Sequence, residues 1–462
     1  MQISTTLDAA TPRQVQVDES TRMKPKIVER LHDWLYLERS VHRMIAGWGR
    51  HMAEWQDKIS THRHIWDQAE IVRRLSLRTN EFLGGNPNAP VSAKLEELVN
   101  TVLLAPSHQD AVDGIYQIFT GALVKGYLNH VQGVHPVHDA PSIQLLQEIV
   151  TIKEQHRLWL REYRRRYPHR INAAYLAAIN EKLAACENLE KPLPLEAGKA
   201  AQPVGVNTSF RLPASAARPA GAEPKHDFMP YLEPDFPRSI ETRRLFWAYG
   251  YMRELNLADE QLRWIYDGHF MPWEFLYDVS RHLWDESRHG DSGHSRLLDF
   301  GITIQDIGFS DYENYGPGPA EPMTPKDLYE RVFFIGMVAE TGHFEVKNEA
   351  YKDFKEGGDM ESAEMMLFDI IDETMHVQYA HRWLPILAER AGVDNSSYRE
   401  RSVEDRKRLQ AEMDKRRAEH AKLPRADSNP DYAFYQKLLQ IMRDKQPLSN
   451  ASTCPERSPM PM

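Results

Sequence analysis

Residues 368–379, Phe-Asp-Ile-Ile-Asp-Glu-Thr-Met-His-Val-Gln-Tyr, contain the pattern that decides the fold class. Apolar side chains recur in this stretch every three or four residues, which is the period of one face of an α-helix. They are Phe368, Ile371, Met375 and Tyr379. Segments of the same kind cover most of the chain and strand signals are nearly absent, so the sequence predicts an all-α protein.

Length and charge exclude several classes of partner. The chain has 462 residues, enough for several domains at roughly 100 to 200 residues each. Lysine and arginine number 57 against 67 acidic residues, and no basic stripe of the kind that binds nucleic acid is present. The apolar runs fall far short of the roughly 18 to 20 residues of a membrane span. We therefore expect a soluble protein with neither nucleic acid nor a membrane as partner.

The cysteines and the first residues bear on the compartment. Only Cys186 and Cys454 occur, which is too few for a disulfide framework or a cysteine zinc site. Residues 1–26 are polar, include Asp8 and Asp18, and have no apolar core, so they do not match a secretory signal. Both observations predict a cytoplasmic protein.

Proline and charge patterns divide the chain into segments. A Pro/Ala-rich stretch cannot continue a helix and indicates a semi-rigid linker between two helical halves. A helix over 403–423 is heavily charged and has no apolar stripe. The expected segments are a polar tail (1–25), a first helical half (26–187), the linker (188–236), a second helical half (237–395), and the charged helix with a mobile tail (396–462).

The two halves contain similar short motifs. Residues 64–68 (His-Ile-Trp-Asp-Gln) resemble residues 282–286 (His-Leu-Trp-Asp-Glu), an offset of 285 − 67 = 218. Residues 156–159 (His-Arg-Leu-Trp) resemble residues 381–384 (His-Arg-Trp-Leu), an offset of 381 − 156 = 225. Because the order is kept, we expect a tandem duplication of one helical unit. Coincidence in helix-rich sequence is the alternative.

Five Glu-x-x-His pairs place a carboxylate and an imidazole on one helix face, because residues three apart are neighbours on a helix. They are Glu29/His32, Glu223/His226, Glu286/His289, Glu340/His343 and Glu373/His376. The first two are expected to be solvated surface groups. The other three lie in the second half.

The distances of four glutamates from two turns suggest that they share one layer. Residues equidistant from the turn of a helical hairpin lie at the same level, because each residue rises 1.5 Å. Glu254 lies 15 residues before the turn at His269, and Glu286 lies 17 after it. Glu340 lies 17 residues before Gly357, and Glu373 lies 16 after it. Glu241 and Glu260 compete with Glu254 but match these arms less well.

A buried layer of four carboxylates and two imidazoles requires a compensating charge, since isolated buried charge is very costly. A divalent metal would supply it. Oxygen-rich ligand sets with one imidazole per ion suit iron or manganese, and two ions would use the whole set.

This pattern, a Glu and then a Glu-x-x-His on each of two helix pairs, resembles the ferritin-like di-iron carboxylate proteins. The resemblance covers about residues 237–395 and implies a four-helix bundle holding two iron ions, with Mn/Fe left open. It implies that Glu286 and Glu373 bridge the ions. The implied ligands are Glu254, Glu286 and His289 for one iron, and Glu340, Glu373 and His376 for the other.

Five further residues bear on this site. His343 is expected to be either a seventh ligand, as in some relatives, or an outer hydrogen-bond donor. His282 and Asp369 are expected to make outer hydrogen bonds to the ligands. Gly290 and Gly293 follow His289 directly, and glycine weakens a helix, so the helix is expected to break or bulge there.

The first half lacks this ligand set. The motif alignment puts Gln68, Ile71 and Thr151 where the second half has Glu286, His289 and His376. We expect a degenerate copy of the bundle, which either packs against the active half or serves only as a scaffold. The predicted fold is therefore two tandem ferritin-like four-helix bundles.

The resemblance implies an O2-activating oxidase or oxygenase that acts on a small organic substrate and takes electrons from an external donor. Substrate is expected to enter near Gly336 and Met337. An iron-binding or ferroxidase-type protein and a structural helical protein remain alternatives. The sequence leaves a homodimer open.

Overall fold

The computed structural model describes residues 26–195, 199–223, 240–309 and 322–445. These residues form helices joined by turns and irregular segments, so the all-α prediction is confirmed. The described residues contain no strand, and a single β-bridge joins Ser92 to Ala200. None of the described helices combines the length and apolar character needed to cross a membrane.

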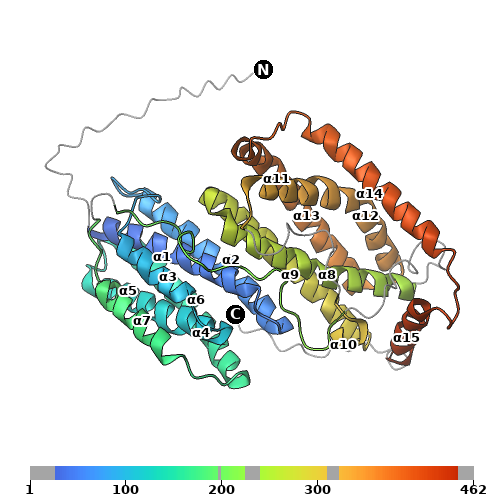
Figure 1. Cartoon of the computed structure of the whole chain (residues 1–462), viewed down its shortest axis with the longest axis horizontal. Helices are drawn as coiled ribbons and strands as arrows, with labels where there is room; N and C mark the ends of the chain where they lie inside the picture. Colours follow the sequence, from blue (N-terminus) through green and yellow to red (C-terminus); the bar gives the residue numbers. More distant parts are fainter. Residues whose placement is uncertain (1–25, 196–198, 224–239, 310–321, 446–462) are drawn as a thin grey trace, which may run out of the picture.

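The helices fall into two groups along the chain (Figure 1). The first group consists of α1 (Lys26–Gly49), α2 (Trp55–Asn80), α3 (Ala93–Leu103), α4 (His108–Val112), the π-helical segment η2 (Asp113–Phe119), α5 (Thr120–Gly133), α6 (Ala140–Arg166), α7 (Ala173–Ala185) and the 3-10 turn η3 (Glu187–Leu189). The second group begins with α8 (Ile240–Asp267), the 3-10 turn η5 (Gly268–Phe270), α9 (Trp273–Asp299) and α10 (Ile304–Ile307). It continues with α11 (Pro325–Phe333), the π-helical segment η6 (Phe334–Ala339), α12 (Glu340–Glu356), α13 (Met360–Ala391), α14 (Tyr398–His420) and α15 (Pro430–Lys445).

The order of elements in the first group recurs in the second. A pair of long helices comes first in each, α1 with α2 and α8 with α9. A helix, a π-helical segment and two further helices follow, as α4–η2–α5–α6 and as α11–η6–α12–α13. π-helical segments are rare and often occur at functional sites. Their recurrence at the same place in the order of elements indicates that the two groups share one arrangement.

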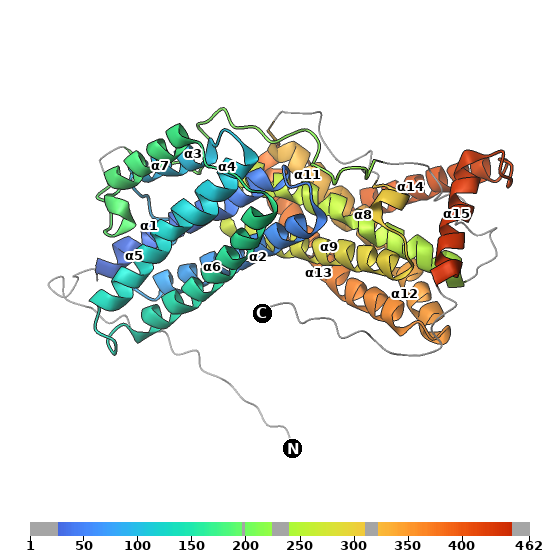
Figure 2. The ribbon, with the colours of Figure 1, turned by 90° about the horizontal axis from the view of Figure 1, so that it is seen from below.

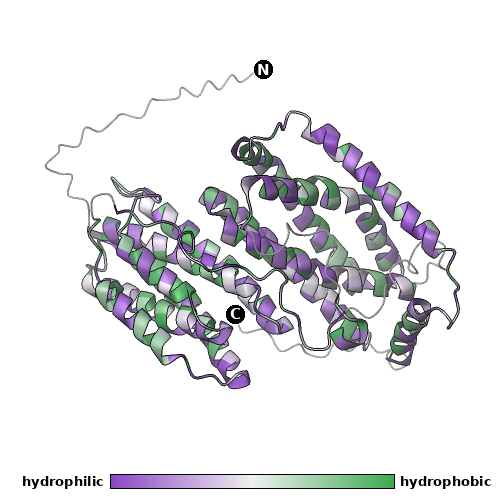
Figure 3. Ribbon diagram, in the orientation of Figure 1, coloured by the Kyte–Doolittle hydropathy of each residue, from purple (hydrophilic) through white to green (hydrophobic). Residues whose placement is uncertain are grey.

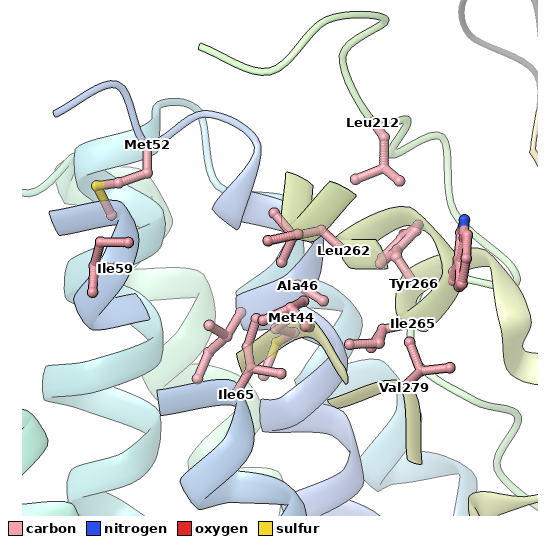
Figure 4. Packing of buried hydrophobic residues seen from close by; sticks show 14 of the residues in the cluster. Met44, Ala46, Met52, Ile59, Ile65, Leu212, Leu262, Ile265, Tyr266 and Val279 are labelled. Carbon is pink, nitrogen blue, oxygen red and sulfur yellow. The ribbon is translucent and has the colours of Figure 1, made fainter. Parts of the chain in front are cut away.

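The two groups meet along their long helix pairs, with α1 packed on α8 and α2 on α9 (Figure 2). Figure 4 shows side chains of both groups interlocking there, including Met44 and Ile65 from the first and Leu262 and Val279 from the second. These residues belong to one continuous hydrophobic core. The halves are therefore not separate bodies held by a tether.

Buried polar contacts also join the groups. Lys58 Nζ lies 2.7 Å from Asp259 Oδ1, and both side chains are almost fully buried. His62 Nδ1 lies 2.7 Å from the hydroxyl of Ser287. Such contacts stabilise one relative placement of the halves, because separating them would leave buried charge and buried donors without partners.

The segment expected as a semi-rigid linker instead packs over this junction. The backbone amide of Ala217 donates to the carbonyl of Arg50 in the first half (2.8 Å), and Ala222 accepts from the amide of Phe309 in the second (2.7 Å). Ala222 is fully buried. Residues 196–198 and 224–236 of the predicted linker, like the predicted polar tail 1–25, lie outside the described residues.

Two glycines bring α9 close to α8. A Cβ on Gly293 would lie 2.3 Å from the backbone nitrogen of Met252, and one on Gly290 would lie 3.1 Å from Leu255. The helix runs unbroken through both glycines, so the expected break next to His289 is wrong. The glycines replace side chains that would hold the two helices apart.

The C-terminal part contains one expected helix and one unexpected helix. The charged α14 has Ser402 as its buried residue and is hydrophilic along its length (Figure 3), as predicted. The next helix, α15, lies where a mobile tail was expected and buries Phe434, Tyr435 and Leu438. Only residues 446–462 of that tail lie outside the described chain.

Candidate metal site

The second half brings all six predicted ligands into one buried layer between α8, α9, α12 and α13. Their ligand atoms fall into overlapping groups within which all atoms lie within 4.8 Å of one another. The groups are His282, Glu286, Glu340 and His376; Glu254, Glu286 and His289; and Glu254, Asp369 and Glu373. Glu286 and Glu254 each belong to two groups, so the layer can hold two ions that share carboxylates.

The helix geometry explains the convergence. α9 and α13 each carry a Glu-x-x-His pair on the face that points into the layer. On α13 the apolar stripe that predicted the helix is partly exposed to solvent, with Phe368 59% and Ile371 50% exposed. Glu373 and His376 take the buried face of this helix instead.

His282 lies closer to the centre than expected. Its Nε2 lies 2.9 Å from Glu340 Oε1 and 3.2 Å from Glu286 Oε1. Its ring stacks on that of His376, with centroids 3.6 Å apart. The structure therefore places His282 among the candidate ligands rather than outside them.

His343 is not brought into any of these groups. Its side chain is exposed, whereas Glu340 and Lys347 on the same helix are buried. Seven residues make almost two helical turns, so Glu340 and Lys347 form the inward line of α12. Among the competing glutamates, Glu260 pairs with Arg50 at 3.5 Å, outside the layer.

Many polar atoms of the layer lie close to one another, such as His289 Nδ1 and Glu254 Oε2 at 3.2 Å, but make no well-aligned hydrogen bond among the described residues. They are Glu254 Oε2, Glu286 Oε1, both carboxylate oxygens of Glu340, Glu373 Oε2, His282 Nε2, His289 Nδ1 and His376 Nδ1. A buried polar atom without a partner is costly, and most such atoms in native proteins are satisfied. The oxygen and imidazole atoms left over are the donor types that iron and manganese prefer, so this residue set fits two such ions.

Two aspartates that the sequence analysis missed orient the histidines. His376 Nε2 lies 3.3 Å from Asp285 Oδ2, and His289 Nε2 lies 3.2 Å from Asp372 Oδ2. Each aspartate comes from the opposite helix, α9 or α13. A carboxylate on the far nitrogen fixes the ring and leaves Nδ1 free to bind a metal. The sequence signal was present, since an aspartate directly precedes each ligand glutamate in both motifs.

Lys347 was also missed, and it is the one lysine in the layer. Its Nζ lies 2.8 Å from Asp369 and 2.7 Å from Glu373. Asp369, expected as an outer contact, also accepts a hydrogen bond from the hydroxyl of Tyr251 (2.8 Å) and lies 3.4 Å from His289. A single ammonium does not balance the five carboxylates of the layer.

The pKa directions show that burial and the contacts between carboxylates and imidazoles act together in this layer. Burial alone would raise the pKa of each carboxyl, and at Glu254 it prevails and raises the pKa to about 7. At Glu340 the nearby imidazoles of His282 and His376 outweigh burial and lower the pKa to about 2. The pKa of His289 lies well above its ordinary value despite burial, because carboxylates surround the ring.

A small cavity lies against the histidine side of the layer. It is about 20 Å³ in volume and is lined by His282, His376, Gly336 and mostly apolar side chains from α8, α9, α11 and α13. This volume suits one or two water-sized molecules. Gly336, near which substrate entry was expected, is one of the lining residues. Met337 is buried but does not line the cavity, and its carbonyl accepts from Arg406 (2.8 Å).

The first half repeats one contact of this layer. His156 Nε2 lies 3.2 Å from Asp67, as His376 does from Asp285 at 3.3 Å. Each histidine also lies against the ring of a second one three residues before the aspartate. The rings are tilted in the first half, with centroids 3.9 Å apart, and stacked in the second, with centroids 3.6 Å apart. His156 therefore corresponds to His376, an offset of 376 − 156 = 220, and not to His381.

With this register, a lysine stands where the second half has a candidate ligand. Lys153 corresponds to Glu373, since 373 − 153 = 220. Its Nζ lies 2.7 Å from Glu38 and 2.6 Å from Gln68, in a fully buried cluster. Thr151, which the sequence alignment had placed opposite a ligand histidine, is exposed.

Comparison with known proteins adds one match. A family model described as "Protein of unknown function (DUF455)" matches residues 241–427. The matched region is less than half of the chain and contains every residue of the candidate metal site. No curated protein and no solved structure matches the chain.

Proposed function

We propose that the second half binds two iron ions and uses them to activate O2, as an oxidase or oxygenase with an external electron donor. The observation that carries the proposal is the set of buried carboxylate and imidazole atoms that converge within 4.8 Å of one another without well-aligned hydrogen bonds. A purely structural helical protein would be expected to bury apolar or mutually bonded side chains there.

The proposal extends to the architecture and origin of the two halves. Each half would be a ferritin-like four-helix bundle, and the two would have arisen by duplication. The recurring order of helices and π-helical segments supports this reading, as does the repeated histidine–aspartate contact. We also propose a cytoplasmic location, because the N-terminal sequence is polar and cysteine is scarce.

Specific residues would hold the ions. Glu254, Glu286 and His289 would bind one ion, and Glu340, Glu373 and His376 the other, with His282 as an additional ligand near Glu340. Glu286 belongs to two of the ligand groups and would bridge, and Glu254 also belongs to two. Glu373, which the resemblance implied as the second bridge, is grouped with Glu254 and Asp369 alone. Paired iron ions at such a site would supply the electrons with which O2 is reduced.

The chain's own residues would prepare this chemistry. Asp285 and Asp372 would keep the proton of each ligand histidine on Nε2 and hold Nδ1 toward the layer. Lys347 would partly neutralise Asp369 and Glu373. The apolar walls of the neighbouring cavity would limit access of water.

A second candidate is an iron-handling protein of the ferroxidase type, without an organic substrate. The size of the cavity favours it: about 20 Å³ leaves room for O2 but little for an organic molecule. The long additional half argues against a storage cage built from single compact bundles.

The test is anaerobic loading with Fe(II), followed by metal analysis and by O2 uptake with a reductant. We expect about two metal ions per chain, given one Glu-x-x-His set for each ion. Fewer than about one ion per two chains would reject the site. O2 uptake that stops when the iron is oxidised would indicate iron handling, whereas continued uptake with reductant and an organic substrate would indicate an oxygenase.

Glu241→Ala provides a matched control. This glutamate lies on the same helix as Glu254 but faces Arg443 at the surface, 3.4 Å away. The variant should load as much iron as the unaltered protein. Loss of iron in this control would show that loading depends on general surface charge rather than on the layer.

A further inference from the structure

A second cavity lies at the junction of the two halves, near the C-terminal end of α8. Its volume is about 100 Å³. Its walls come from α1, from α8 and the turn after it, and from residues 205–212, which pack over the junction. Figure 4 shows Leu212 of that segment and Tyr266 of α8 at this edge of the core.

The cavity is lined by more positive than negative charge. Three arginines border it, Arg43, Arg211 and Arg263, against one carboxylate, Asp267. The carboxylate is already engaged, because it accepts a hydrogen bond from the amide of Met323 (3.0 Å) and lies 3.5 Å from Arg263. The lining therefore has a surplus of guanidinium groups.

Arg43 is the key residue, because it is buried and only partly satisfied. Its side chain is about 6% exposed. Nε donates to the carbonyl of Tyr266 (2.5 Å), and Nη2 lies 3.3 Å from Nδ1 of His269. Nη1 is buried and has no hydrogen-bond partner within the described parts of the chain. Keeping a guanidinium there is costly, and burial lowers the pKa of Arg43 to about 10.

The other walls are apolar and aromatic. The rings of Phe210 and Tyr266 lie 5.4 Å apart, and the Arg43 guanidinium lies 4.8 Å from the centre of the Tyr266 ring. Gly205 has φ +85°, and a Cβ there would lie 2.2 Å from the Tyr266 hydroxyl. Glycine thus lets the segment 205–212 close over the aromatic wall.

We propose that this cavity binds a small molecule bearing an oxyanion, a carboxylate or a phosphate, with its remaining part against Phe210 and Tyr266. Arginine donates two parallel hydrogen bonds to such groups, and three arginines border this cavity against one engaged carboxylate. The site is distinct from the metal layer. Tyr266 follows Glu254 by 12 residues on α8, which corresponds to about 18 Å along the helix.

The experiment is calorimetric titration of the full-length protein with inorganic phosphate and, separately, with benzoate. We expect saturable binding of at least one of them at one site per chain. Binding of phosphate alone assigns a phosphate ligand, and tighter binding of benzoate assigns a carboxylate with an apolar body. Absence of binding by both at about millimolar concentration would overturn the proposal.

Variants locate the site. Arg43→Gln should weaken binding on the order of tenfold or more, and Arg211→Gln should weaken it several-fold, because each removes a charged donor. Arg170→Gln removes the same charge from an exposed position of the first half and should leave the affinity unchanged. If Arg43→Gln does not fold, the affinity of Arg211→Gln for the same ligand still tests the site. Unchanged affinity in Arg211→Gln, or an equal loss in Arg170→Gln, would overturn the proposal.

Discussion

The buried polar clusters of the two halves lie at corresponding helices but differ in how the charge of their carboxylates is neutralised. In the first half Lys153 neutralises Glu38 at 2.7 Å, and the Tyr127 hydroxyl donates to the same carboxylate at 2.5 Å. Gln68 also donates to Glu38. This cluster is closed by the protein's own cation.

The second half leaves the corresponding charge open. Glu373 takes the place of Lys153, and the cluster gains the carboxylates of Glu286 and Glu340. Lys347, which corresponds to Tyr127 (347 − 127 = 220), offers a single ammonium in return. Under the proposed duplication, a few substitutions on one helical framework would convert a self-neutralised cluster into one that binds a cation from outside.

The largest expected effect comes from removing a buried carboxylate of the proposed metal layer. Glu373→Ala should reduce bound iron from about two ions per chain to near zero, because each ion needs several charged ligands. Metal analysis after anaerobic loading measures this. Retention of a full pair would contradict the role of Glu373. His381→Ala, altered at a histidine that contacts Tyr398 outside the layer, should keep both ions.

The closed cluster gives the next largest effect. Lys153→Met leaves Glu38 buried without its cation, and the free energy of unfolding should fall by about 3–5 kcal/mol. Urea denaturation measures the change. Iron binding by the second half should persist in the folded fraction. Lys125→Met, at an exposed ion pair with Glu190, should leave the urea midpoint unchanged. An equally stable Lys153→Met protein would break the comparison.

Two histidines near the second layer should differ in effect. His282→Ala should weaken iron binding by about 10–100-fold, because its Nε2 lies against both Glu286 and Glu340. His343→Ala should leave the affinity unchanged, since its side chain is exposed. Competition with a chelator of known affinity measures both. The reverse order would restore His343 as a ligand.

The close approach of α8 and α9 should be sensitive to a single methyl group. In Gly293→Ala the new Cβ meets the backbone of Met252 and Ala248, so stability should fall by about 1–3 kcal/mol and iron affinity should fall with it. Gly250→Ala on α8 has open space around its Cβ and should be neutral or stabilising. Thermal denaturation compares the two variants. Equal melting temperatures would show that the helix contact is not constrained there.

The smallest effect concerns pH. In the metal-free protein the pKa of His289 and of His376 lies well above the ordinary value. The protonated imidazoles therefore stabilise the folded state fully below about pH 6.5, and this contribution to the free energy of unfolding is lost as pH rises through the raised pKa. Iron requires neutral imidazole, so loading should release protons. The increase in melting temperature on loading should therefore grow between about pH 6 and pH 8. A constant increase would argue that the histidines are not ligands.

Sequence reasoning predicted the helices and the six-residue layer because both depend on local spacing. It missed Asp285, Asp372 and Lys347, whose partners lie on other helices. It also took residues 381–384 as the counterpart of residues 156–159, because aromatic and histidine motifs can match in more than one register. The register comes from tertiary contacts, since His156 lies against Asp67 and His64 as His376 lies against Asp285 and His282.

The sequence by itself determined the all-α class and the pairing of each Glu with a Glu-x-x-His at matched distances from a turn, because helical rise and period follow from the backbone. Tertiary structure decided which face of α13 is buried, which histidine reaches the layer and how the halves meet. These features depend on contacts between residues far apart in the chain, such as Gly293 against α8 and Lys58 against Asp259. The spacing of residues within one helix does not predict the energies of such contacts.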